Sequence, residues 1–332
     1  GGTVGRVGIC VVGLGHGRRH ARVYAGMEEV DLFLCEADEG KLRQFAEELR
    51  PKGVFRSWEE AAKSPQVQAL DIALPHHLHR DAVVAALGAG KHVMVEKPLA
   101  RTLEEADEML EAARRAGVLF LVAEDYRFVP QARKARELIE QGKIGEVFHL
   151  RSFEMWEDVA EPPWRAKREL MGGGELIDSG VHLIHLLRML GGEVEWVFAA
   201  GTRFKLEMEG EDTAHLLLGF KGGAVGALTS GWAARFTEPH SLFSVYGTKG
   251  CIFEFQGKLL LWSEGDPEFG EGPREVEVPQ VDRHEALCRH FVKCLLGGNL
   301  GLLLAEEGRK DLEVAVAAYR SMREGRAVRL PL

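Results

Sequence analysis

Lys97 occupies a position in the sequence that is typical of a ligand-binding residue. It belongs to the tripeptide Glu96-Lys97-Pro98, which directly follows an apolar, strand-like run at His92–Val95. Open α/β sheets bind ligands at the carboxyl ends of their parallel strands, so an ammonium group held there can contact a bound molecule. The alternative is a surface lysine in front of a helix, and the tripeptide by itself does not decide between them.

Asp178 and His182 form a second candidate pair, in a segment that opens with three consecutive glycines at residues 172–174. Residues four apart in a helix share one face, so the two side chains would project together. A histidine titrates near neutral pH, and beside a carboxylate and an ammonium it can accept the proton of an alcohol. The alternative is an aspartate that caps a helix and a histidine that packs in the core.

The segment Gly13-Leu14-Gly15-His16-Gly17 follows the strand-like run Val7–Val12. Glycines at such a turn let a pyrophosphate approach backbone N–H groups at a helix N-terminus. The usual spacing is G-x-G-x-x-G, whereas here the third glycine comes one residue early and Arg18 follows it. The motif indicates a dinucleotide site, and a glycine-rich turn without a nucleotide is the alternative.

Glu36 strengthens the nucleotide interpretation because it ends the next apolar run, 23 residues after Gly13. An acidic side chain at this place in a βαβ unit binds the ribose hydroxyls of a dinucleotide. A carboxylate repels the 2′-phosphate of NADP, and the next residue is Ala37 rather than an arginine. We therefore expect NAD as the cofactor, with NADP possible; a solvated glutamate in a loop is the alternative for Glu36 alone.

The first 124 residues alternate apolar runs with helical patterns, which indicates βαβ units and a parallel sheet. The clearest helix is expected at Thr102–Ala116, where Thr102 and Glu105 form a capping box and Gly117 ends the helix. Further strands are expected near Asp31–Cys35, Ala69–Leu74 and Val118–Ala123.

The second half of the chain has a different sequence pattern, in which glycine-rich turns separate strand-like runs and few helices are expected. This succession favours an antiparallel sheet in an α+β domain. Strands are expected near residues 146–156, 193–204, 213–220, 224–233, 242–247 and 251–255, with helices near 131–141, 175–190, 283–296 and 305–323. We divide the chain into a dinucleotide-binding α/β domain at residues 1–124 and an α+β domain at residues 125–332. The family resemblance described next implies a Rossmann fold for the first domain, and substrate binding and oligomerisation for the second.

Taken together, these elements resemble the glucose-fructose oxidoreductase, inositol dehydrogenase and MocA family, written Gfo/Idh/MocA. Further stretches that fit the family are Leu74-Pro75-His76-His77-Leu78-His79, Gly90–Leu99, Tyr126-Arg127-Phe128, Lys143–Val147 and Tyr246–Gly250. The likeness covers nearly the whole chain. It implies an α/β protein in which a doubly wound Rossmann sheet precedes an open, mostly antiparallel sheet that serves in oligomer contacts, as a homodimer or homotetramer.

The resemblance also implies roles for individual residues. Lys97 would hydrogen-bond the reacting hydroxyl, His182 would accept or donate its proton, and Asp178 would help to set the site. The residues expected at the cofactor are Gly13, Leu14, Gly15, His16, Gly17, Glu36, Leu74, Pro75, His79, Glu96 and Lys97. Those expected at the substrate are Lys97, Arg127, Arg165, His182 and His185, of which His185 stands where the family often has aspartate.

The function we expect is that of an NAD(P)-dependent oxidoreductase that transfers a hydride between nicotinamide and a carbinol carbon. Its substrate would be a sugar, a polyol or a related hydroxy compound. Two alternatives remain on the same fold: a redox-neutral NAD-dependent glycosidase, and a non-catalytic regulator that senses a dinucleotide. Intact Lys97, Asp178 and His182 argue against the regulator, because a sensor does not need a proton-transfer set.

Composition excludes several other classes of protein. The 332 residues carry a net charge of −9 without a basic cluster, which disfavours nucleic acid and anionic lipid as partners. No stretch approaches about 18 consecutive apolar residues. Five cysteines without a C-x-x-C pair favour a reduced, cytoplasmic protein. We expect no metal, because the histidines at 76–79 and 182–185 lack a further ligand at a typical spacing.

Overall fold

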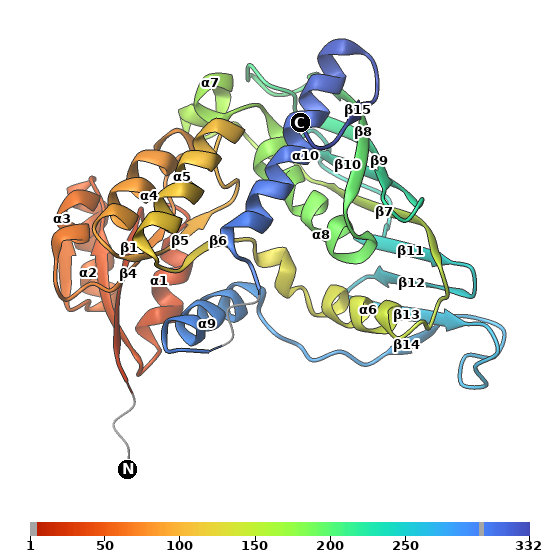
Figure 1. Ribbon diagram of the computed structural model, residues 1–332, viewed down its shortest axis with the longest axis horizontal. Helices are drawn as coiled ribbons and strands as arrows, with labels where there is room; N and C mark the ends of the chain where they lie inside the picture. The colour runs from red at the N-terminus through yellow and green to blue at the C-terminus, as the bar shows by residue number, and fades with distance from the viewer. Residues whose placement is uncertain (1–4, 299–301) are drawn as a thin grey trace. The chain divides into compact units, whose positions relative to one another are not determined.

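A computed structural model describes residues 5–298 and 302–332, and within them the chain forms two compact units (Figure 1). The first unit consists of the chain up to Glu124 together with His284–Lys310, and the second consists of Asp125–Arg283 together with Asp311–Leu332. Each unit has its own sheet.

The sheet of the first unit has six parallel strands in the order β3-β2-β1-β4-β5-β6. Its strands are β1 (Val7–Val12), β2 (Val30–Cys35), β3 (Gly53–Phe55), β4 (Ala69–Ile72), β5 (His92–Glu96) and β6 (Phe120–Ala123). The order turns back at β1, as in a doubly wound Rossmann fold, which confirms the predicted fold of this half. All six residues of β1 are buried, because helices cover both faces of such a sheet.

The helices of this unit connect successive strands, apart from α9, which belongs to the later segment of the chain. They are α1 (Arg18–Ala25), α2 (Glu39–Leu49), α3 (Trp58–Lys63), α4 (His79–Gly88), α5 (Leu103–Ala116) and α9 (Arg283–Leu295), with a 3₁₀ turn at His76–Leu78. In α5 the side chain of Thr102 accepts a hydrogen bond from the Glu105 N–H, and Gly117 ends the helix with φ +65°. The predicted start and stop of this helix are therefore both present.

Residues 284–310 belong to the first unit, although the sequence analysis placed them in the second domain. The reason lies in two contacts of this segment. Helix α9 buries an apolar face that includes Leu287 and Phe291. Beyond it, Leu303 accepts a backbone hydrogen bond of 3.0 Å from Val122, so the segment pairs with β6, the edge strand of the parallel sheet. Such pairing covers backbone groups that an edge strand would otherwise leave exposed.

The second unit is built on a nine-stranded sheet in the order β14-β13-β12-β11-β7-β10-β9-β8-β15. Its strands are β7 (Val147–Met155), β8 (Val194–Thr202), β9 (Thr213–Phe220), β10 (Val225–Gly231), β11 (Phe243–Gly247), β12 (Gly250–Phe255), β13 (Lys258–Ser263), β14 (Arg274–Val276) and β15 (Val328–Arg329). All neighbouring strands are antiparallel except the parallel pair β7 and β10. The predicted open, mostly antiparallel sheet is confirmed.

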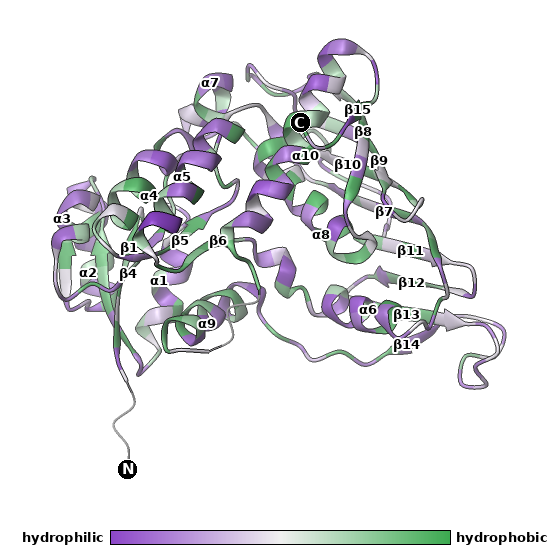
Figure 2. Ribbon diagram, in the orientation of Figure 1, coloured by the Kyte–Doolittle hydropathy of each residue, from purple (hydrophilic) through white to green (hydrophobic). Residues whose placement is uncertain are grey.

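Helices cover one face of this sheet (Figure 1). They are α6 (Pro130–Glu140), α8 (Val181–Gly191) and α10 (Ala305–Glu324). The unit also contains the short helix α7 (Arg168–Met171) and single turns at Asp125–Phe128, Pro163–Ala166 and Leu176–Gly180. The core lies between helices and sheet, and leucines 150, 216 and 218 point into it. Figure 2 shows hydrophilic and hydrophobic segments alternating along these helices, as expected when only one stripe of a helix is buried.

The opposite face of the nine-stranded sheet carries apolar side chains that remain exposed. Phe198 on β8 lies beside Leu217 on β9, which lies beside Ala227 on β10. Phe148 and Tyr246 are also exposed on strands of this sheet. Alternation along a strand sends successive side chains to opposite faces, so Phe198, Leu217, Ala227 and Tyr246 share the face that the helices leave open. Phe148 lies where the pairing of β7 with β11 is irregular, so its exposure does not follow from alternation.

Two further features of the described residues concern the environment of the chain. None of the helices they form is both long enough and apolar enough to cross a membrane. The five cysteines are all free thiols.

Candidate active site

The glycine-rich turn of the first unit requires glycine at two positions, Gly13 and Gly17. Gly13 has φ +90°, and a Cβ there would lie 2.3 Å from the carbonyl oxygen of Ala73. A Cβ on Gly17 would lie 2.1 Å from the Gly13 carbonyl oxygen and 2.9 Å from a methyl group of Val11. Gly17 thus provides the close helix–strand approach that the third glycine usually provides, although it comes one residue early.

Gly15 differs from Gly13 and Gly17, because a Cβ added at Gly15 would meet no heavy atom within 4 Å. Gly15 and His16 are exposed and lie just before the first residue of α1. The turn therefore leaves open space beside a helix N-terminus, where a phosphate group can bind.

Glu36 lies at the end of β2 and contacts this turn. One of its carboxylate oxygens accepts a hydrogen bond of 2.9 Å from the Leu14 N–H, and the other accepts one of 3.1 Å from the Asp38 N–H. The structure thus brings together the glycine turn and the acidic residue that the sequence singled out. The carboxylate is partly exposed, as a ribose-binding group has to be.

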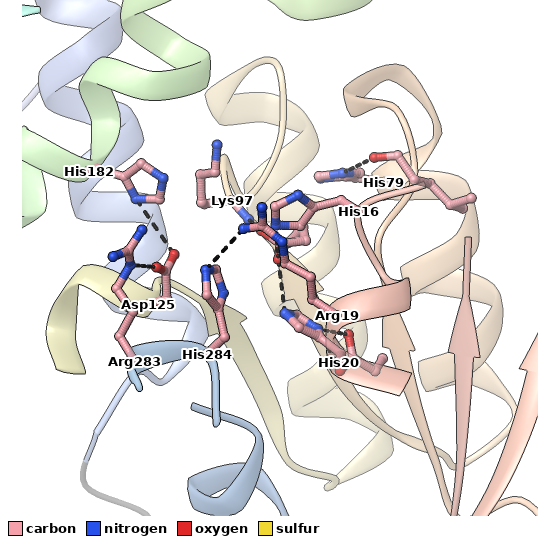
Figure 3. A network of polar contacts seen from close by, with 12 residues as sticks. His16, Arg19, His20, His79, Lys97, Asp125, His182, Arg283 and His284 are labelled. Carbon is pink, nitrogen blue, oxygen red and sulfur yellow. Dashed lines mark hydrogen bonds and ion pairs between the residues drawn. The ribbon is translucent and has the colours of Figure 1, made fainter. Parts of the chain in front are cut away.

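His79 links two loops of the first unit and has no exposed surface. Its Nε2 lies 2.9 Å from the Leu74 carbonyl oxygen, and its Nδ1 lies 3.0 Å from the Pro98 carbonyl oxygen (Figure 3). Burial lowers the pKa of His79 to about 4, so the ring is neutral at pH 7. His79 therefore supports the loop of Leu74 and Pro75 from behind, and the partly exposed residues of that loop form its surface.

Glu96 is nearly buried at the end of β5 and contacts two histidines. Its Oε1 lies 3.3 Å from His20 Nε2 and 3.4 Å from His16 Nε2. Its Oε2 accepts the backbone N–H of Lys97 at 3.2 Å. Lys97 itself is partly exposed at the carboxyl end of the parallel sheet, the location that the sequence predicted.

In the second unit, three glycines precede a wide helical turn rather than a ligand loop. The hydroxyl oxygen of Tyr319 accepts the N–H groups of Gly174 and Ile177 at 3.0 and 3.1 Å, and the hydroxyl donates to Glu211 at 2.8 Å. The residues that follow, Leu176–Gly180, form one turn of π-helix, and α8 begins after it. Asp178 lies in the π-turn, and His182 lies in the first turn of α8.

Asp178 and His182 contact different charged partners. Asp178 Oδ2 lies 3.1 Å from the Arg165 guanidinium, which also contacts Asp158 at 3.3 Å. The guanidinium carbon of Arg165 lies 4.4 Å from the centre of the Trp232 ring. Two carboxylates and an indole thus hold Arg165 in place.

His182 stacks on Tyr126, with ring centres 4.1 Å apart and an angle of 11° between the planes. Its Nδ1 lies 4.0 Å from Asp125, which is held by Arg283 at 2.5 Å (Figure 3). The Tyr126 hydroxyl donates to Glu154 at 2.6 Å, and burial together with Glu154 raises the pKa of this phenol, so it stays protonated. The imidazole is only 13% exposed but not sealed from solvent.

Arg127 and His185 were expected at the substrate, and the structure gives them different environments. Arg127 is partly exposed in the turn after β6. His185 is 1% exposed, with its Nδ1 2.8 Å from Asp311, and Arg188 contacts the same carboxylate at 2.7 Å. Burial alone would raise the pKa of Asp311, but His185 and Arg188 keep this pKa below its usual value. His185 therefore belongs to a buried ion-pair cluster between α8 and α10, not to an accessible surface.

Four charged or titratable residues of the site were not predicted from the sequence: Asp125, Arg283, His20 and Asp71. Asp125 carries the same signal as Glu36 and Glu96, an acidic residue just after an apolar strand-like run. Asp71 is a single carboxylate inside the otherwise apolar strand β4, and this is a signal for a buried polar partner. Arg283 is 158 residues from Asp125, and nothing local connects the two.

Comparison with known proteins agrees with both halves of the structure. Residues 6–124 match the family model described as "Oxidoreductase family, NAD-binding Rossmann fold", and residues 132–253 match the one described as "GFO/IDH/MocA C-terminal domain". The chain is 30% identical to myo-inositol 2-dehydrogenase of Thermotoga maritima, with 97% of this chain and 98% of the relative aligned. It is 29% identical to scyllo-inositol 2-dehydrogenase (NAD(+)) of Bacillus subtilis, with 98% and 96% aligned.

Solved structures show the same architecture over almost the full length. Levoglucosan dehydrogenase in complex with NADH and levoglucosan gives a TM-score of 0.90 at 25% identity, covering 98% of this chain and 100% of that chain. Aldose-aldose oxidoreductase from Caulobacter crescentus, complexed with glycerol, gives a TM-score of 0.88 at 27% identity, with the same coverage.

Proposed function

The chain belongs to the Gfo/Idh/MocA family of oxidoreductases, and we propose that it transfers a hydride to or from the carbinol carbon of a sugar, polyol or related hydroxy compound. It is an NAD(P)-dependent enzyme that acts on CH–OH groups. The nicotinamide supplies the hydride acceptor or donor when it is bound. The observation that carries the proposal is His182, an imidazole stacked on Tyr126 and near Asp125, with access to solvent.

The residues of the first unit fit a dinucleotide. We assign the pyrophosphate to the open backbone at Gly15 and His16, because a side chain at Gly15 would fill that space. Leu14 and Gly17 shape the turn, and the exposed loop of Leu74 and Pro75 offers a further contact surface. His79 supports that loop without touching the cofactor, since it has no exposed surface.

We assign the adenosine ribose to Glu36, and from this we infer a preference for NAD over NADP. A carboxylate accepts both ribose hydroxyls and repels a 2′-phosphate. Titration of the purified protein with each dinucleotide tests the assignment. NAD should bind more tightly than NADP, and Glu36→Ala should reduce the difference between the two affinities. Tighter binding of NADP to the unchanged protein would overturn it.

We propose that His182 accepts the proton of the substrate hydroxyl during oxidation. Asp125 lies beside Nδ1, so its charge favours the tautomer that carries the proton on Nδ1, and Nε2 is then the basic nitrogen. Stacking on Tyr126 fixes the plane of the ring. A positioned base of this kind contributes about 10²–10⁴-fold to the rate.

Lys97 and Asp178 complete the proposed set. Lys97 would donate a hydrogen bond to the reacting hydroxyl, which stabilises the negative charge that develops on oxygen. Asp178 is paired with Arg165. We therefore propose that Asp178 positions Arg165 and the first turn of α8, and that His182 alone transfers the proton.

We propose an uncharged polyhydroxy compound as the substrate. Arg165 is already paired with Asp158 and Asp178, so it suits hydroxyl groups better than a substrate carboxylate. Trp156 and Trp164 are partly buried near Trp232 and offer flat apolar surfaces for the C–H face of a sugar. Arg127 remains a candidate contact, and we assign His185 to the packing of α8 rather than to the substrate.

The test is a panel of sugars, inositols and sugar acids, monitored by nicotinamide absorbance with NAD and NADP separately. We expect NAD reduction with neutral sugars or inositols and little with sugar acids. Turnover of a glycoside without net reduction would identify the redox-neutral glycosidase instead. Tight dinucleotide binding without turnover of any compound would favour the regulator.

We also propose a homodimer or homotetramer formed through the open face of the nine-stranded sheet. The exposed row of Phe198 and Leu217 supports it, because contiguous apolar surface of this kind is typical of subunit contacts. Light scattering should give a multiple of the 36.8 kDa chain mass. Leu217→Lys should lower that mass, and a monomer at micromolar concentration would refute the proposal.

The cytoplasm is the compartment we propose, and the support is the state of the cysteines. Cys10, Cys35, Cys288 and Cys294 are buried free thiols, which is usual in reducing surroundings. Cell fractionation tests this placement, and recovery in a membrane or exported fraction would contradict it.

A further inference from the structure

His20 lies between two carboxylates from neighbouring strands of the parallel sheet. Its Nδ1 is 2.9 Å from Asp71 Oδ2 on β4, and its Nε2 is 3.3 Å from Glu96 Oε1 on β5 (Figure 3). His20 and Asp71 have no exposed surface, and Glu96 is 7% exposed. The contact with Asp71 is a hydrogen bond, whereas the contact with Glu96 is an ion-pair approach without hydrogen-bond alignment.

The charge of this cluster depends on the protonation of His20. A neutral imidazole carries one N–H and one lone pair, so one ring nitrogen would turn a lone pair toward a carboxylate. An imidazolium carries N–H groups on both nitrogens and is attracted by both carboxylates. Burial opposes any charge, but a buried carboxylate without a cation is more costly than a buried ion pair.

Other titratable and charged groups lie near His20 and its two carboxylates. The Tyr24 hydroxyl donates to Asp71 at 2.6 Å, and burial together with Asp71 raises the pKa of this phenol, so it remains a donor. The Cys288 thiol of α9 lies within 4.8 Å of the ligand atoms of His20 and Asp71. His16 contacts the same oxygen of Glu96, and Arg19 contacts His284 at 3.3 Å.

Glu96 connects His20 to the loop that holds Lys97. Oε1 of Glu96 contacts His20, and the other carboxylate oxygen, Oε2, accepts the Lys97 backbone N–H. Just beyond Lys97, the carbonyl oxygen of Pro98 lies 3.0 Å from His79. The backbone on both sides of Lys97 is therefore held by side chains from other elements, and His20 holds one of these side chains.

We propose that His20 is a positioning residue, kept as an imidazolium by Asp71 and Glu96, and that this buried charge fixes the backbone at Lys97. The inference rests on the role proposed for Lys97. It adds a residue that contacts neither the hydroxyl nor the cofactor and acts through Glu96.

Nitrogen spectroscopy of the full-length apoprotein tests the charge directly. With ¹⁵N-labelled histidine, the two ring nitrogens of His20 should show the nearly equal shifts of an imidazolium from pH 6 to pH 9. His92 is the internal reference, because burial lowers its pKa and it should show the neutral pattern at pH 7.5. The signals are assigned by their loss in His20→Gln or, if that variant does not fold, by their shift in Tyr24→Phe. A neutral pattern for His20 at pH 7.5 would overturn the proposal.

Glu96→Gln tests the link between the two residues without any measurement of activity. The amide keeps an oxygen that can accept the Lys97 N–H but removes one negative charge beside His20. The pH at which His20 loses its proton should therefore fall. An unchanged titration of His20 in this variant would refute the part assigned to Glu96.

The kinetic test compares His20→Gln with His92→Gln, a substitution at the opposite end of β5. We expect His20→Gln to lower kcat/KM at least about tenfold, chiefly through kcat, with the Kd for NAD changed less than threefold. His92→Gln should stay within twofold of the parent. A folded His20→Gln enzyme with parental kcat contradicts the positioning role, whereas an unaltered Lys97→Ala enzyme contradicts only the role of Lys97.

Discussion

Two glycine-rich segments, one in each unit, look alike in the sequence but differ in the space beside their central glycine. In the first, a Cβ on Gly15 would meet no heavy atom within 4 Å. In the second, a Cβ on Gly173 would lie 2.4 Å from the Tyr319 ring, and one on Gly174 would lie 2.5 Å from the backbone nitrogen of Glu211. One segment keeps open space beside its backbone, and the protein fills the other with its own side chains.

The difference shows that clustered glycines do not by themselves indicate a ligand site. At the first segment the absence of side chains gives a ligand access to the backbone. At the second it lets Tyr319 approach and bind two backbone N–H groups, which secures the wide turn before α8. The first segment is therefore the candidate for binding, and the second positions the residues that follow it, including His182.

The largest effect on activity is expected at His182, which follows the second glycine-rich segment. His182→Ala should lower kcat/KM at least about a hundredfold, because the hydroxyl then loses its base. In the parent enzyme the oxidation rate should rise with pH through the titration of His182, since only the neutral imidazole accepts a proton. This rise should vanish in the variant, and NAD titration should show intact binding. Near-normal turnover with the parental pH profile would make His182 a packing residue.

Gly173→Ala tests whether the second segment is as tightly filled as the distances indicate. The added methyl group collides with the ring of Tyr319, and such overpacking costs about 1–3 kcal/mol of unfolding free energy. Denaturant unfolding measures this loss, and the Kd for NAD of the folded variant should remain unchanged. If the unfolding midpoint stayed at the parental value, the contrast between the segments would be lost.

Gly15→Ala is the reciprocal experiment in the open segment. The methyl group meets no protein atom, so the unfolding midpoint should not change. It occupies space assigned to the pyrophosphate, so the Kd for NAD should rise about tenfold, or about 1.4 kcal/mol. Calorimetric titration measures the affinity, and parental affinity would show that the ligand does not approach the backbone at Gly15.

The smallest effect is expected at Glu175, which directly follows the filled glycines and is fully buried. Burial raises the pKa of Glu175 well above its usual value, so the folded state retains a proton that the unfolded state releases. Stability should therefore fall as the pH rises above about 4.3, the ordinary pKa of glutamate. Glu175→Gln should remove this loss, so the unfolding free energy of the variant should rise relative to that of the parent between pH 5 and pH 8. The prediction would be contradicted if the unfolding free energies of the parent and of Glu175→Gln changed with pH in the same way.

The sequence predicts the first unit well because its signals are local. A strand, a glycine turn and a helix follow one another within residues 7–25, and the acidic residue that contacts the turn ends the next strand. The lysine after β5 likewise needs only the pattern of its own strand. In the second unit the strands β7 to β12 follow from alternation and turns, whereas β13, β14 and β15 escaped prediction; two of these have only two or three residues.

Contacts between distant residues are what the sequence did not predict. Asp178 and His182 were expected to act as a pair, but one is held by Arg165 and the other lies near Asp125. His185 was expected at the substrate because of the family resemblance, and its partner Asp311 lies 126 residues away. Such partners depend on which helices pack together, and helical periodicity gives a face but not the element that covers it. The roles of the site residues stay predictions until the variants are measured.

The return of residues 284–310 to the first unit has a consequence for how this protein can be recombined. The chain passes from one unit to the other after residues 124, 283 and 310, so neither unit corresponds to one uninterrupted stretch of gene. A chimera that exchanges only the first 124 residues with a relative would set a foreign β6 against the native strand partner at Leu303. Replacing the nucleotide-binding half as a module therefore requires a two-part exchange, in which α9 and the segment up to residue 310 travel with the parallel sheet.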